Sequence, residues 1–86
     1  MSVTALAFKT PVESHVEKIR RLRDEAEASA HDHSRAFLRA IADLESVASD
    51  IADGGEVYPV GVRERARRLI AELDGARLNI ESILER

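Results

Sequence analysis

The sequence predicts an all-α protein, a long antiparallel helical hairpin that dimerises into a four-helix bundle. Three observations predict this fold. No Gly or Pro occurs between residues 12 and 53, the apolar residues recur at helical spacing, and a single turn-forming segment, GGEVYPVG at 54–61, divides the chain. The composition agrees, because 44% hydrophobic, 34% charged and only 3% aromatic residues are typical of long helices packed side by side.

The 86 residues form one domain, and their composition excludes several classes of protein. The absence of Cys excludes disulfide bonds and thiolate metal sites. No run of about 20 apolar residues is present to span a membrane, and the start of the chain lacks the features of a secretory signal. A net charge of −3 with both signs interspersed gives no general attraction to nucleic acid or lipid. We therefore expect a cytoplasmic location.

We expect an N-terminal arm at 1–10, followed by a single helical domain at 11–86. Thr10 and Glu13 have the spacing of a capping box, with Pro11 at the first helical position, so the first helix is predicted over 11–53. Glycines after Asp53 end it, the turn covers 54–61, and the second helix runs over 61–86.

Both helices carry apolar residues at alternating steps of four and three, the heptad spacing of a coiled coil. The first stripe contains Phe37, Ile41, Leu44, Ala48 and Ile51, and the second contains Val62, Ala66, Leu69, Leu73, Ala76, Ile80 and Ile83. An antiparallel hairpin turning near residue 57 pairs them from Ile51 opposite Val62, through Ala48 opposite Ala66 and Leu44 opposite Leu69, to Phe37 opposite Ala76.

The first helix is much longer than the second, so part of its apolar surface has no partner within a simple hairpin. A second apolar line flanks the stripe of the second helix. The predicted partner or dimer surface comprises Val12, Val16, Ile19, Leu22, Arg23, Ala26, Ile70, Arg77 and Leu84. A second copy covers this surface in a dimer; alternatively the first helix breaks near residues 29–34 and folds back as a monomeric three-helix bundle. The absence of Gly and Pro favours the dimer.

Two further readings concern charged and titratable residues. Arg63, Arg67 and Arg68 belong to the densest basic cluster and are candidate nucleic-acid contacts, although neighbouring acids oppose phosphate binding. A dimeric hairpin with a histidine on its first helix, here His15, His31 or His33, resembles the dimerisation and phosphotransfer domain of sensor kinases. That resemblance implies a histidine phosphotransfer protein, but the usual proline soon after the histidine is absent.

No residue pattern indicates catalysis, a cofactor or a metal. His31 and His33 are two residues apart, so one helix directs them to opposite sides and they cannot share an ion. No serine lies in a glycine-rich elbow. The sequence therefore predicts a non-enzymatic, homodimeric interaction or structural module whose partners are itself or another protein, with a small nucleic-acid-binding hairpin as the alternative.

Overall fold

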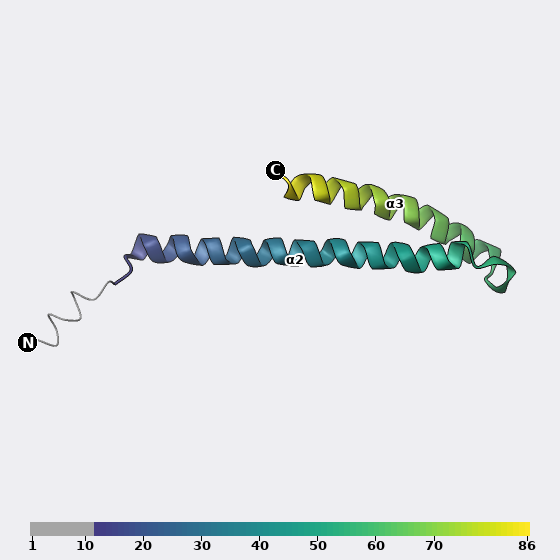
Figure 1. Ribbon diagram of the computed structural model, residues 1–86, viewed down its shortest axis with the longest axis horizontal. Coiled ribbons are helices and arrows are strands. Elements are labelled where there is room, and N and C mark those ends of the chain that lie inside the picture. Colours follow the sequence, from purple (N-terminus) through teal and green to yellow (C-terminus); the bar gives the residue numbers. More distant parts are fainter. Residues whose placement is uncertain (1–11) are drawn as a thin grey trace, which may run out of the picture. The chain divides into compact units, whose positions relative to one another are not determined.

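The computed structural model describes residues 12–86 and is all-α over that range. Helix α2 spans His15–Ala52, a short 3-10 helix η1 spans Gly55–Val57, and helix α3 spans Val60–Leu84. The described chain divides into two units between Ala30 and His31, and α2 contributes to both. Within the second unit α3 returns antiparallel alongside α2, which confirms the helical hairpin (Figure 1).

Helix α2 begins four residues later than the sequence predicted. Val12 and Glu13 are not helical, and Ser14 caps the helix instead. The backbone N–H of Glu17 donates to Ser14 Oγ at 3.1 Å, and the backbone N–H of Ser14 donates to Glu17 Oε2 at 3.2 Å. This is a reciprocal capping box, one helical turn after the predicted one. The predicted cap at residues 10–11 and the arm at 1–10 lie outside the described residues.

No break occurs in α2 near residues 29–34, so the predicted alternative of a fold-back at that point is wrong for this structure. A helix tends to break at Pro, at Gly or where another group inserts into its hydrogen bonds, and α2 contains neither residue type. Every described residue from Val12 to His33 is exposed.

The turn is built much as predicted. Helix α2 ends at Ala52, and Gly55 takes the left-handed conformation with φ +75°, whereas Gly54 stays right-handed. The ring of Tyr58 lies where a side chain on residue 54 would be, so any larger residue there would have to displace that ring. Helix α3 then begins at Val60, one residue earlier than predicted, with Pro59 at its N-cap.

The core between α2 and α3 is small and agrees with the predicted stripes in part, since Ile41, Ala48 and Ala66 are buried as predicted. The buried side chains are Leu38, Ile41, Ala48, Ala52 and Ala66, and Ile51 and Ile70 pack partly buried against the three alanines. Phe37, predicted to pack opposite Ala76, is instead 55% exposed. The hairpin therefore buries three alanines with Leu38 and Ile41, and it leaves Phe37, Leu44 and Val47 about half exposed.

Candidate interaction surface

An open apolar groove runs between α2 and α3 on one side of the hairpin. It has a volume of about 330 Å³, and its walls are almost entirely apolar. Leu44 and Val47 on α2 and Val62 on α3 are 45%, 54% and 47% exposed. The lining residues are Leu44, Val47, Ala48, Ile51, Gly61, Val62, Arg65, Ala66 and Leu69. Three of the predicted pairs line this groove. Ala48 and Ala66 are buried, as predicted, whereas the pairs Leu44–Leu69 and Ile51–Val62 remain partly open to solvent.

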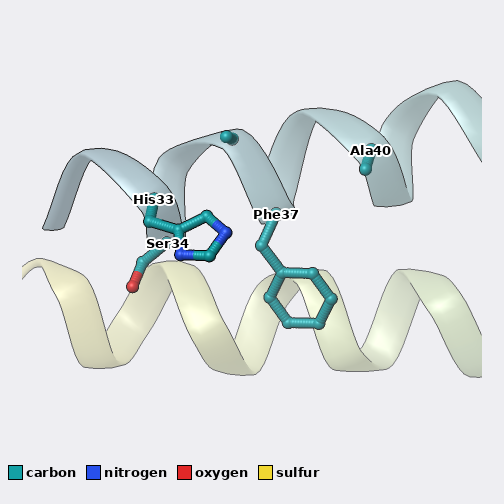
Figure 2. Close-up of a pocket in the computed structure, with 5 residues that line it drawn as sticks. His33, Ser34, Phe37 and Ala40 are labelled. Atoms are coloured by element: carbon teal, nitrogen blue, oxygen red, sulfur yellow. The ribbon is translucent and has the colours of Figure 1, made fainter. Parts of the chain in front are cut away.

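A second hollow on α2 continues the same side of the helix toward its N-terminus. It is lined by His33, Ser34, Ala36, Phe37 and Ala40. His33 and Phe37 lie one turn apart and point to the same side of α2 (Figure 2). Together with the groove residues of α2 they form a stripe at alternating steps of four and three. We call this the open stripe: His33, Phe37, Ala40, Leu44, Val47 and Ile51.

The N-terminal unit carries a stripe of its own. Val16, Ile19 and Leu22 are about half exposed, and Val12 is more exposed still. Arg23 and Ala26 are exposed as well. These six were predicted as partner surface, and all lie at the surface of the described chain. Five of them, with Ala30, have heptad spacing, and we call this the N-terminal stripe: Val12, Val16, Ile19, Arg23, Ala26 and Ala30.

Two of the remaining three residues of the predicted partner surface, Ile70 and Arg77, contact α2. Ile70 packs against the alanine cluster, and Leu84 is half-buried. Arg77 binds three carboxylates, donating from Nε to Glu45 Oε1 at 3.2 Å, from Nη1 to Glu81 Oε1 at 3.2 Å and from Nη2 to Asp74. Hydrogen bonds to Asp74, then Glu45 and Glu81, raise the pKa of Arg77. Ile70 and Arg77 therefore stabilise the hairpin itself.

Two of the three arginines proposed to contact nucleic acid form hydrogen bonds to backbone carbonyls near the turn. Arg63 Nε donates to the carbonyl of Tyr58 at 3.1 Å. Arg67 Nη2 donates to the carbonyl of Ala52, the last residue of α2, at 3.0 Å. A cation there satisfies a free carbonyl and opposes the negative end of the helix dipole. Arg68 is exposed. Two of the three side chains thus have a structural partner.

The histidines form no metal-binding constellation in residues 12–86, where no group of three or more His, Cys, Asp or Glu side chains could hold an ion. His15 is the first residue of α2, and His33 lines the apolar hollow. None of the helices in the described range is long and apolar enough to cross a membrane.

Sequence reasoning assigned Phe37, Leu44 and Val62 to a closed core, and it missed Val47 and Ala40 altogether. The signal that identifies them is the complete run of heptad positions on α2, in which Val47 and Ala40 fill the gaps between Leu44, Phe37 and Ile51. On α2 the predicted Ile41 and Ala48 are buried, together with Leu38 and Ala52, which the prediction did not include.

These features define the class of protein as an all-α helical hairpin with one face closed by α3 and one apolar face open. In the comparisons with known proteins, no family model, no curated protein and no solved structure matched the chain.

Proposed function

We propose that this chain is a non-enzymatic structural or interaction module that works as a homodimer through its open apolar face. The observation that carries the proposal is the groove between α2 and α3, where Leu44, Val47 and Val62 remain about half exposed. Continuous apolar surface of this kind marks an interaction site. A cytoplasmic location fits a chain without Cys.

The hairpin needs a partner because its own core is small. Within residues 31–86 the large buried side chains are Leu38 and Ile41, and the other buried residues are alanines. Small domains bury a small fraction of their surface and are marginally stable without further contacts. Two-helix units gain the missing burial when they assemble into four-helix bundles.

A second copy of the chain fits the open face better than an unrelated surface does. The exposed apolar residues of α2 have heptad spacing, which matches a partner helix with the same spacing. Each copy provides such a helix. Closed dimers with two-fold symmetry use the same patch on both subunits, so one self-complementary stripe covers both open faces.

The proposal is tested by sedimentation equilibrium of the full chain and two matched variants. Val47→Glu places a charge on the exposed groove wall, whereas Ser46→Glu places the same charge on the neighbouring exposed residue, which does not line the groove. We expect wild type and Ser46→Glu to be dimers and Val47→Glu to be a monomer with unchanged helicity by circular dichroism. A monomeric wild type at all concentrations, or equal dimerisation of both variants, would refute the proposal.

Neither alternative function gains an observation from the structure. Arg63 and Arg67 are bound to backbone carbonyls, and the open face is apolar rather than basic. The histidines lie on exposed parts of α2. We therefore develop the homodimer alone.

A further inference from the structure

The N-terminal stripe and the open stripe belong to one heptad register. Ala30 ends the N-terminal stripe and His33 begins the open stripe three positions later. The alternating steps of four and three residues therefore continue without interruption along the sequence of α2. The twelve positions are Val12, which lies just before α2, and, within the helix, Val16, Ile19, Arg23, Ala26, Ala30, His33, Phe37, Ala40, Leu44, Val47 and Ile51. We call them the α2 seam. Two of its residues, Arg23 and His33, are polar.

We infer, on the basis of the proposed homodimer, that the N-terminal stripe of each copy occupies the open stripe and groove of the other in an antiparallel arrangement. The two-fold axis passes between residues 31 and 32, midway along the α2 seam. In an antiparallel coiled coil, the a positions of one helix face the d positions of the other. Within α2 the facing pairs are Val16–Val47, Ile19–Leu44, Arg23–Ala40, Ala26–Phe37 and Ala30–His33. Val12, which precedes the helix, would lie near Ile51 at the end of the seam.

Side-chain sizes favour this register. Each of the three bulky or polar residues near the centre, Arg23, His33 and Phe37, faces an alanine of the other copy. The remaining layers join aliphatic side chains of similar size. Pairing of large with small residues fills a helix interface to native density without voids.

The two neighbouring antiparallel registers match side-chain sizes less well. A shift by one heptad in one direction sets Phe37 against His33 and leaves Ala30 opposite Ala40, which combines a crowded layer with an empty one. A shift in the other direction sets Arg23 against His33 and Ala26 against Ala30. Both overpacking and cavities destabilise an interface.

A parallel dimer is disfavoured by charge and volume. Each seam residue would then face its own copy, so two Arg23 guanidinium groups would meet in the interface, and Ala26 and Ala30 would each leave a gap. In the antiparallel register Arg23 faces a small side chain, and the exposed carboxylate of Asp43 lies one turn further along the same helix. An opposite charge near Arg23 reduces the cost of holding it in the seam.

The groove also fits the segment that would enter it. Val16 and Ile19 would face Val47 and Leu44, which form the α2 wall of the groove, while Val62 and Leu69 form the wall on α3. Each N-terminal stripe would therefore contact two helices of the other copy, which makes a three-helix arrangement at each end of the dimer. The open face and the exposed N-terminal stripe cover each other.

Cross-linking of single-cysteine variants tests the register, because the natural chain has no Cys. Val16→Cys and Val47→Cys proteins are unfolded together, refolded and treated with a short bismaleimide. We expect a cross-linked product of twice the 9.5 kDa chain mass from the mixture and none from either variant alone. Ala28→Cys mixed with Val47→Cys is the control, since residue 28 is exposed and lies outside the seam, and it should give no product.

The outcomes separate this inference from the homodimer on which it rests. Cross-linking of Val16→Cys with itself would indicate parallel helices, and a dimer without a link between residues 16 and 47 would indicate another register; both would overturn the antiparallel inference alone. The double variant with both cysteines should give a covalent dimer. An internal link in a chain that sediments as a monomer would overturn the inference and the homodimer together.

Discussion

Replacing Ile19 by alanine tests the dimer at a position where the substitution should have little effect on the stability of the single chain. Ile19 is 47% exposed, and alanine is a better helix former, so α2 itself should not be weakened. The change removes three carbons, each contributing about 0.8 kcal/mol when buried. With about half of that burial left for the partner to provide, the loss is about 1.2 kcal/mol per copy and about 2.4 kcal/mol per dimer. The Kd should therefore rise roughly 50-fold.

Sedimentation equilibrium over a range of concentrations measures this change directly. Lys18→Ala is the control, because it also shortens an exposed side chain on the same turn but lies outside the α2 seam. We expect its Kd to equal that of the wild type. If Ile19→Ala and Lys18→Ala dimerise equally well, then the N-terminal stripe does not contribute to the interface and the reasoning fails.

Three further predictions concern single side chains. His33→Leu should lower the Kd of the dimer because an apolar residue replaces a polar one in the seam. A gain of about 1 kcal/mol per copy corresponds to a roughly 30-fold lower Kd, and a weaker dimer in sedimentation would contradict this. Arg77→Ala should lower the thermal unfolding midpoint, since three carboxylates lose their shared cation, whereas Arg68→Ala should leave it unchanged. Hydrogen bonding from Arg21 lowers the pKa of Glu13, so this pair stabilises the start of α2 above the ordinary pKa of a glutamate and loses that effect as pH falls through the lowered pKa. Carbon NMR titration should show a higher pKa for Glu13 in Arg21→Gln, and an unchanged pKa would refute the pairing.

The helices and the turn between them could be predicted because their signals are local. Gly55 has the positive φ that glycine adopts readily, and Pro59 lies at the N-cap of α3. The start of α2 was less clear, since two capping boxes, beginning at Thr10 and Ser14, lie four residues apart. Glu13, assigned to the first box, instead binds Arg21 with both carboxylate oxygens, at 2.8 and 3.1 Å. That contact over eight residues has no local signature.

The face that α2 presents to α3 could not be predicted from apolar content alone. Helix α2 has two overlapping stripes, and the one with larger side chains, through Phe37 and Leu44, is the stronger pattern. The hairpin keeps Ile41 and Ala48 of the predicted stripe but adds Leu38 and Ala52 in place of Phe37 and Leu44. Small residues at 48, 52 and 66 allow the helices to approach closely, and the Glu45–Arg77 ion pair joins them beyond that cluster. The predicted partner residues Ile70 and Arg77 are consequently part of this internal contact.

The contacts inferred between two copies could also form within one chain, if α2 broke at residues 30–33 and folded back. Such a chain would gain a local concentration in the millimolar range but would give up about four backbone hydrogen bonds of α2, each worth about 1 kcal/mol. A dimer keeps those bonds in both copies, so it is the favoured form at micromolar concentration. Inserting two glycines between His31 and Asp32 removes this advantage and should convert the dimer into a monomer in which Val16 still contacts Val47. A variant that remains a dimer would show that the continuity of α2 does not decide the assembly.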